Sequence, residues 1–341
     1  MTNTKSELRE ARSIAIARVC IFLALAGFFP AQAGSIDGIY AFGDSLTDVG
    51  NIYAATNGAA PAPPYVNGQL SNGNVWVQDL ASDLGLAPLR SSLLGGTDYA
   101  YGTAESGVTA FNTSAPNTDL IGATGQLAQY QTTHATADPN ALYTIWIGAN
   151  DLSDMLTGQL PSQYAADTGE VVGNIYAAIN TLAGMGAKNF LVLTVPDLGK
   201  TPEVLAGGPA ESAGASFLSS SFDTALTGGI PGLAAADSVN ISVLNTYLLL
   251  DTIVANPASY GFSNVTQPCL TGEVNYAGGT PCANPSEYLF WDELHPTAAG
   301  HEIVADEALA LVTPEPASIS LIALGLIGLA IWRRPFAGDR R

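Results

Sequence analysis

Ala141-Leu142-Tyr143-Thr144-Ile145-Trp146-Ile147 is the stretch of this 341-residue sequence that decides its fold. Nearly all of its side chains are apolar or aromatic, and the run ends at Gly148. An apolar run of this length without polar alternation predicts a strand that is buried on both faces. A second run of the same kind covers residues 190–195 and ends at Pro196. Strands buried on both faces are typical of a parallel sheet with helices on each side.

Strand-length and helix-length patterns alternate along the rest of the chain. The predicted strands are 38–42, 98–101, 141–147, 190–195 and 239–244, and the predicted helices are 75–84, 120–133, 163–185, 210–226 and 297–312. Thr297 is expected to cap the last helix. No internal repeat or long linker divides residues 34–313, so we predict one α/β domain with a parallel sheet. In such a domain, ligands bind beyond the carboxyl ends of the strands.

The N-terminal segment, residues 1–33, has the features of a secretory signal peptide. Three arginines precede an apolar run of 11 residues, 19–29, and Ala31-Gln32-Ala33 follows it. A membrane-spanning helix needs roughly 20 apolar residues, so a membrane anchor is the weaker interpretation. We expect cleavage after Ala33 and export of the remaining chain.

The C-terminal segment, residues 314–341, resembles the PEP-CTERM sorting signal. It contains Pro314-Glu315-Pro316, the apolar stretch 317–332 and the basic pair Arg333-Arg334, in that order. The resemblance implies recognition by an exosortase-type enzyme and delivery to the cell envelope or extracellular matrix of a Gram-negative bacterium. It also implies a transient association of 317–332 with the inner membrane. An uncleaved C-terminal anchor is the open alternative.

The body between these segments is strongly acidic. Residues 34–313 contain 3 of the 11 basic and 26 of the 30 acidic residues, which gives a formal charge of −23. Nucleic acids and anionic membranes both require basic patches, so a nucleic-acid partner is excluded for this body.

Two cysteines remain in the body, Cys269 and Cys282. In an oxidising compartment we expect them to form a disulfide. A metal site is the disfavoured alternative because no His and no third Cys lies near them.

Polar residues with catalytic chemistry follow the predicted strands. Ser45 comes just after the first strand, and Asn150 follows the strand that ends at Ile147. Asp292 stands three residues before His295, just ahead of the last helix. Serine becomes a nucleophile when a base removes its proton, and an aspartate can hold that base in the required tautomer. These residues therefore predict acyl transfer at the carboxyl edge of the sheet.

Three sequence blocks resemble the GDSL, or SGNH, hydrolase family. They are Phe42-Gly43-Asp44-Ser45-Leu46-Thr47-Asp48-Val49-Gly50-Asn51, Gly148-Ala149-Asn150-Asp151 and Asp292-Glu293-Leu294-His295-Pro296-Thr297. The resemblance covers nearly all of 36–312 and implies a three-layer α/β/α flavodoxin-like fold. It also implies an esterase or lipase without a metal or organic cofactor.

The resemblance further assigns residues to roles. Ser45, Asp292 and His295 would be catalytic, and Ser45, Gly102 and Asn150 would form the oxyanion hole. The block around Gly102 departs from the family's Asn-Tyr-Ala-x-Gly-Gly-Ala, with Asp98 in place of Asn and Thr103 in place of the second glycine. Whether Gly102 or Thr103 supplies the second backbone amide therefore stays open.

Several nearby residues have structural interpretations. Asp44 and Asp48 are expected to hold the turn after the first strand, and His301 is expected on the surface of the last helix. The proline-rich loop 57–69 is expected to line an acyl or sugar pocket.

The substrate stays open between a lipid or short-chain acyl ester and an acetylated extracellular polysaccharide. A noncatalytic matrix or surface protein that retains the fold is the alternative from another class.

Overall fold

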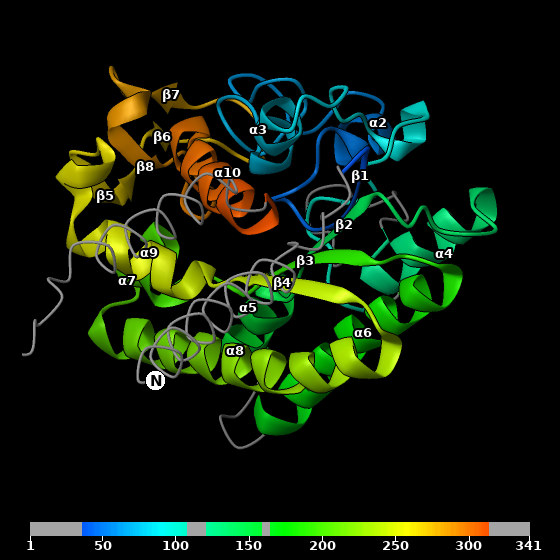
Figure 1. Ribbon diagram of the computed structural model, residues 1–341. Helices are drawn as coiled ribbons and strands as arrows, with labels where there is room; N and C mark the ends of the chain where they lie inside the picture. The colour runs from blue at the N-terminus through cyan, green and yellow to red at the C-terminus, as the bar shows by residue number, and fades with distance from the viewer. Residues whose placement is uncertain (1–35, 108–120, 159–163, 314–341) are drawn as a thin grey trace, which may run out of the picture. The chain divides into compact units, whose positions relative to one another are not determined.

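A parallel sheet organises the body of the chain. The computed structural model describes residues 36–107, 121–158 and 164–313, so the predicted signal peptide and the segment 314–341 lie outside the described residues. The sheet consists of β1 (Ile39–Gly43), β2 (Leu142–Trp146), β3 (Asn189–Leu193) and β4 (Asn240–Leu244), in that order and all parallel (Figure 1). All four strands therefore end at the same edge, as predicted.

The predicted strand 98–101 is reduced to short contacts with β1. The Ala41 amide donates to Thr97 O at 3.0 Å, and the Tyr99 amide donates to Ala41 O at 2.7 Å. The segment forms only isolated parallel bridges, from Asp98 to Ala41 and to Ser91, so the prediction of a full strand is wrong. The segment nevertheless lies beside β1, on the side away from β2. Chain order therefore reverses between β1 and β2, which is the kind of position where open α/β sheets bind ligands.

Helices cover both faces of the sheet (Figure 1). One face packs against α4 (Ala123–Thr133), α5 (Ala149–Gly158), α6 (Tyr164–Met185) and α8 (Pro209–Asp237), and the other against α3 (Trp76–Asp83) and α10 (Ala298–Val312). Side chains alternate along each strand. In β2, for example, Tyr143 and Ile145 enter the first core, whereas Leu142 and Trp146 enter the second. The three-layer α/β/α arrangement is thus present.

Several elements differ from the sequence expectations. Helix α8 continues well beyond the predicted end at residue 226 and passes through Pro231. Short elements that the pattern did not predict are α2 (Asn51–Ala55), α7 (Pro202–Ala206), α9 (Thr246–Ala255), β5 (Asn264–Pro268), β6 (Leu270–Thr271), β7 (Thr280–Pro281) and β8 (Tyr288–Phe290). Single turns of 3₁₀ helix occupy Ser92–Leu94, Leu198–Lys200, Pro257–Tyr260 and Pro285–Glu287. Across the described ranges, no helix combines the length and the apolar character needed to cross a membrane.

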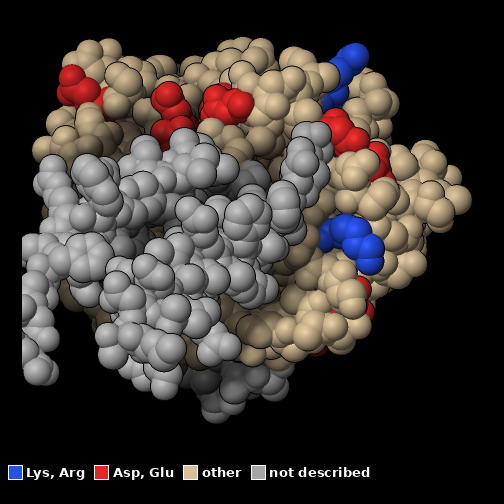
Figure 2. Space-filling view, in the orientation of Figure 1, with Lys and Arg blue, Asp and Glu red and all other residues tan. Residues whose placement is uncertain are grey.

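The surface reflects the acidic composition. Figure 2 shows acidic side chains along the upper part of the visible face, where basic side chains are sparse. Such a surface repels polyanions.

The predicted disulfide between Cys269 and Cys282 is present, with the two Cα atoms 4.8 Å apart. It joins the small antiparallel pair formed by β6 and β7. The Cys282 amide also donates to Cys269 O at 2.7 Å. The disulfide therefore closes the loop 269–282 at its base.

Replacing both cysteines by serine should lower the free energy of unfolding. A loop of 13 residues corresponds to about 3 kcal/mol of chain entropy in the unfolded state. Urea unfolding of the wild type, oxidised and reduced, and of the double variant measures the difference. Equal midpoints for the oxidised wild type and the variant would contradict the prediction.

Candidate active site

Ser45 lies on a tight turn immediately after β1. The amides of Thr47 and Asp48 both donate to Asp44 O at 3.0 Å, and the Leu46 amide donates to Asp44 Oδ1 at 3.0 Å. These bonds hold Ser45 at the carboxyl edge of the sheet, where 6% of its surface is exposed. The expectation that Asp44 holds the turn is confirmed by its contact with Leu46.

His295 lies on the loop between β8 and α10. The Trp291 amide donates to His295 O at 2.7 Å, which closes the loop. Asp292 Oδ1 accepts the amides of Leu294 at 2.9 Å and of His295 at 2.6 Å. Just beyond the loop, Thr297 caps α10 by accepting the Gly300 amide, as predicted. The carboxylate thus fixes the backbone that carries the imidazole.

The structure brings Ser45, His295 and Asp292 into one hydrogen-bonded chain. Ser45 Oγ lies 2.9 Å from His295 Nε2, although the two residues are 250 positions apart. His295 Nδ1 lies 2.8 Å from Asp292 Oδ2. All three side chains are buried. A serine, an imidazole and a carboxylate in this order have the geometry of a nucleophile, a base and a group that orients the base.

The charges of the imidazole and carboxylate stabilise each other. Burial alone lowers the pKa of His295, but the charge and hydrogen bond of Asp292 outweigh it, so the pKa is raised above the usual 6.5. Burial raises the pKa of Asp292, yet the charge of His295 and its hydrogen bonds hold that pKa below the usual 3.8. Asp292 is therefore ionised at neutral pH, and His295 accepts a proton more readily than an exposed histidine.

A tyrosine that the sequence did not assign to the site contacts Asp292. The Tyr65 hydroxyl donates to Asp292 Oδ2 at 2.8 Å, so this oxygen receives two hydrogen bonds, one from Tyr65 and one from His295. Tyr276 packs edge-on against both the Tyr65 ring and the His295 imidazole, at centroid distances of 6.1 and 5.9 Å. Because Tyr65 and Asp292 are 227 residues apart, no local spacing could have revealed this pair.

The loop 57–69 was expected to line the substrate pocket, but it lies elsewhere. The described residues that line the cavity at Ser45 include none from this loop. Instead, Pro61, Pro63 and Tyr65 line a separate surface hollow beside Tyr53. The loop acts on the site through Tyr65 rather than by lining the cavity.

Asn150 stands at the end of β2, in the first turn of α5. Gly148 permits the sharp change of direction, with φ of 120°, and a Cβ there would lie 3.0 Å from the Phe222 ring. The Asn150 side-chain amide donates to Ala104 O at 2.8 Å, and Asn150 lines the same cavity as Ser45 and His295. Its side-chain amide is therefore fixed in the wall of the cavity that Ser45 also lines.

The Gly102 backbone amide has a hydrogen-bond acceptor within the protein. Its amide donates to Asp48 Oδ2 at 2.8 Å, so in this structure the amide is engaged by a carboxyl group. A Cβ on Gly102 would lie 2.9 Å from Ile52 Cδ1, so a larger residue would have to displace the end of the Ile52 side chain. The next residue, Thr103, has φ of 64°, a conformation that favours glycine. Thr103 thus occupies a glycine-like backbone position where the family pattern has its second glycine.

Asp48 has the structural role expected for it. Besides Gly102, it accepts the amides of Gly50, Asn51 and Ile52. These bonds join the turn after β1 to the segment 98–103.

His301 is buried, not exposed as predicted. Only 1% of its surface is accessible, and burial lowers its pKa to about 3. The residue faces the core side of α10, where a neutral imidazole packs as an apolar group.

No cluster of three or more His, Cys, Asp or Glu side chains suited to a metal ion occurs among the residues that the structure describes.

Comparisons with known proteins identify the family. The sequence model of the GDSL-like lipase/acylhydrolase family matches residues 39–308, and that of the PEP-CTERM protein-sorting motif matches residues 312–334. The chain therefore belongs to the GDSL-like lipase/acylhydrolase family and ends in a PEP-CTERM motif. Such a motif indicates export and sorting to the envelope or exterior, typical of Gram-negative bacteria.

Individual relatives agree with this membership. The chain is 30% identical to the thermolabile hemolysin of Vibrio parahaemolyticus, over 82% of this chain and 64% of the relative. It is 30% identical to esterase EstA of Pseudomonas aeruginosa, over 86% and 49% of the two chains. It is 28% identical to a GDSL esterase/lipase of Arabidopsis thaliana, over 86% and 92%. The chain thus spans about half to two thirds of the length of the two bacterial relatives.

Among solved structures, an acetylxylan esterase of Geobacillus stearothermophilus is similar, with a TM-score of 0.44 and 15% identity, over 83% of this chain and 97% of that one.

Replacing Tyr65 by Phe should change the pH dependence of ester hydrolysis. Without the hydroxyl, the Asp292 carboxylate is less well compensated and attracts the protonated imidazole more strongly. The pKa of His295 should rise, and the acid limb of kcat should move up by about 0.5–1 pH unit. Initial rates between pH 5 and 9 measure the limb.

Tyr276→Phe is the matched control for this variant. This control variant keeps the ring against His295 and removes a hydroxyl that bonds to no described residue. The acid limb of its kcat profile should therefore coincide with that of the wild type. If the acid limb of the Tyr65→Phe variant also coincides with that of the wild type, Tyr65 does not affect the pKa of His295.

Proposed function

We propose that this protein is an exported serine hydrolase that cleaves carboxylic esters through an acyl-enzyme on Ser45. The observation that carries the proposal is the chain of hydrogen bonds from Ser45 Oγ through His295 to Asp292, at 2.9 and 2.8 Å. Family membership and relatives named as esterases support the same reaction.

The geometry suits a two-step mechanism. His295 Nε2 removes the Ser45 proton as Oγ attacks the ester carbonyl, and Asp292 stabilises the imidazolium that forms. The tetrahedral intermediate expels the alcohol, which takes the proton from His295. Water then attacks the acyl-enzyme with His295 again as base, and the carboxylic acid leaves Ser45 free.

The oxyanion of each intermediate needs hydrogen-bond donors. The Ser45 amide and the Asn150 side chain are two donors close to the reacting oxygen. For the third we favour the Thr103 amide over that of Gly102, because Gly102 already donates to Asp48. Accordingly, Thr103→Gly should keep activity, since glycine adopts φ of 64° without strain.

Export is the remaining part of the proposal. Residues 1–33 would be removed as a signal peptide, and an exosortase would recognise the PEP-CTERM motif. Temporary insertion of 317–332 in the inner membrane and delivery to the envelope or matrix would follow.

Replacing Ser45 by Ala should abolish hydrolysis of p-nitrophenyl acetate and butanoate. The serine oxygen forms the covalent intermediate, so its loss should reduce kcat by about 10⁴-fold or more. A fluorophosphonate probe should label the wild type at Ser45 and leave the variant unlabelled. An unlabelled, folded wild type would instead favour a noncatalytic surface protein.

Replacing Asn150 by Ala should lower kcat by about 10²–10³-fold, the usual effect of losing one oxyanion donor. KM should change little, because the donor acts mainly in the transition state. Asn189→Ala is a suitable control, since the Asn189 side-chain amide donates to Pro139 O at 3.0 Å at the start of β3, the end of the strand away from the cavity. Equal losses in kcat for the two variants would argue that Asn150 is only structural.

A further inference from the structure

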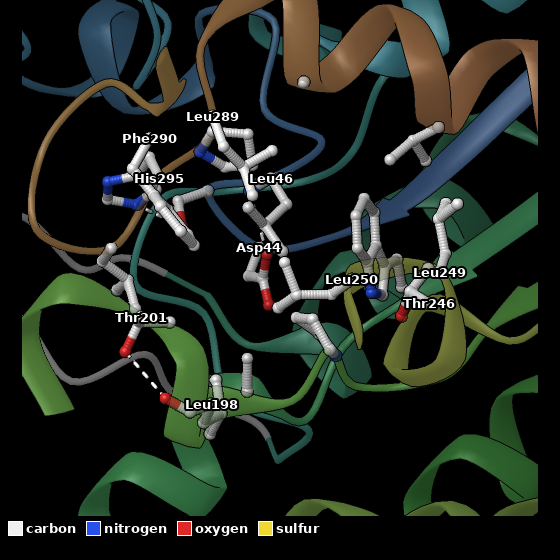
Figure 3. Close-up of a pocket in the computed structure, with 18 of the residues that line it drawn as sticks. Asp44, Leu46, Leu198, Thr201, Thr246, Leu249, Leu250, Leu289, Phe290 and His295 are labelled. Atoms are coloured by element: carbon white, nitrogen blue, oxygen red, sulfur yellow. Dashed lines mark hydrogen bonds between the residues drawn. The ribbon is translucent and has the colours of Figure 1, made fainter. Parts of the chain in front are cut away.

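The surface hollow beside Tyr53 is lined by residues of α2, the loop 57–69, α3 and the segment 89–94. Its volume is about 820 Å³, and small-molecule sites typically occupy ~300–1,000 Å³. Its described lining shares no residue with the cavity at Ser45, which Figure 3 shows with Leu46 and His295 among its labelled side chains. The hollow is therefore a space of its own, and the catalytic reaction does not account for it.

The hollow differs from the rest of the body in its charge. None of its described lining residues is an Asp or a Glu, although residues 34–313 contain 26 acidic residues. Arg90, one of three basic residues in this body, lines the hollow, is exposed and forms no ion pair with a described residue. A ligand in the hollow would therefore meet hydrogen-bonding groups and no carboxylate.

Tyr53 supplies an aromatic ring to the hollow, and 41% of its surface is exposed. Two Asn-Gly turns, 57–58 and 67–68, pack against this side chain. A Cβ on Gly68 would lie 2.5 Å from Tyr53 Cγ, and a Cβ on Gly58 would lie 3.2 Å from the Tyr53 hydroxyl oxygen. Because glycine at both positions lets the loop approach the ring this closely, the ring is fixed while much of its surface stays exposed. A tyrosine fixed in this way offers a large contact surface at a low entropic cost.

Side-chain amides lie around the same hollow. Asn57, Asn67, Gln69 and Gln78 all line it. Only 1% of the Gln69 surface is accessible, and its Oε1 has no hydrogen-bond partner among the described atoms. A buried amide oxygen without a donor is costly, and native structures contain few of them. A hydroxyl group of a ligand in the hollow would supply the missing donor.

This combination of groups fits a saccharide. Amides both donate and accept hydrogen bonds, as sugar hydroxyl groups do, and the apolar face of a sugar ring packs against an aromatic ring. A hydrocarbon chain would leave the amides unpaired, which is costly. A polyanion would be repelled by the acidic body.

From this lining we propose that the hollow beside Tyr53 binds a neutral polysaccharide chain and so attaches the protein to material outside the cell. The proposal does not depend on ester hydrolysis, because the hollow and the catalytic cavity share no described residue.

Affinity gel electrophoresis of the full-length protein tests the proposal. Hydroxyethyl cellulose, arabinoxylan and glucomannan are the neutral polymers, and at least one of them should retard the protein. Alginate and polygalacturonate should not, because both are polyanions. Absence of retardation by all three neutral polymers would overturn the proposal, and so would stronger retardation by the polyanions.

Replacing Tyr53 by Ala removes the ring and should weaken binding of the retarding polymer by at least about fivefold. Phe217→Ala is the matched control, because Phe217 is 69% exposed on α8 and does not line the hollow. Its affinity should equal that of the wild type. Equal affinity of folded Tyr53→Ala and wild type would overturn the proposal.

A second variant covers the case in which Tyr53→Ala fails to fold. Asn57 and Asn67 have φ of 52° and 56°, so glycine replaces both without strain and removes their amides. The double variant should bind at least about threefold more weakly. Asn275→Gly is the matched control, since Asn275 also has φ of 52° but does not line the hollow. Unchanged affinity in the double variant would overturn the proposal.

Ser45→Ala separates the polysaccharide site from the active site. This variant should be retarded like the wild type, and the variants of the hollow should hydrolyse p-nitrophenyl acetate at the wild-type rate. Loss of retardation in folded Ser45→Ala would place the polysaccharide in the catalytic cavity and overturn the proposal. Retardation of a wild type that is inactive on every ester would keep the polysaccharide site and overturn the ester hydrolase.

Discussion

Parallel hydrogen bonding between β1 and β2 is the constraint on which the site depends. The register pairs Gly43 with Trp146, and a Cβ on Gly43 would lie only 2.5 Å from Trp146 O. Glycine at this position therefore permits the strands to remain paired up to their last residues. Because both strands end at the same edge, Ser45 and Asn150 emerge beside each other. A shift of register by one residue would exchange the faces that Ile145 and Trp146 occupy and break both cores.

Buried carboxyl groups determine how the segments around this edge are joined. Asp48 and Asp98 are both buried, and burial raises the pKa of Asp48 to about 6 and that of Asp98 well above its usual value. Backbone amides compensate part of this cost: Asp48 binds the start of α2 and Gly102, while Asp98 accepts the Val49 amide at 2.9 Å. Asp292 differs because it faces an imidazole, and its pKa falls instead. All three acids are thus buried. Of the three, Asp292 is the one that faces an imidazole, and the positive charge of that group keeps its carboxylate ionised.

The sequence predicted the elements whose patterns are local. Continuous apolar runs identified β2 and β3, and the spacing of Asp292 and His295 predicted a contact that forms at 2.8 Å. The disulfide could be predicted equally well, because the exported body contains two cysteines and each has only the other as a partner.

The features that local patterns missed depend on distant parts of the chain. The segment at Asp98 pairs with β1 only through a bridge, and the Gly102 amide is taken by a carboxyl group from 54 residues earlier. His301 was placed on the surface because helical spacing from His295 cannot show what covers α10. Helix α9 lines part of the cavity at Ser45, yet its apolar residues lie on several sides of the helix, so its sequence carries no clear helical period.

The surroundings of His295 link catalysis to the disulfide-closed loop. The Ala62 amide donates to Tyr276 O at 2.9 Å, and the Gly278 amide donates to Pro63 O at 3.0 Å, so the loops 60–65 and 269–282 hold each other. The loop 269–282 supplies the Tyr276 ring that packs against His295, and the loop 60–65 supplies the Tyr65 hydroxyl that donates to Asp292. Because disulfides persist in oxidising compartments, the bond that closes loop 269–282 is stable in the environment to which the PEP-CTERM motif directs the chain. Asp292, the acid that we propose orients the base, is therefore supported by a pair of loops whose disulfide is stable after export.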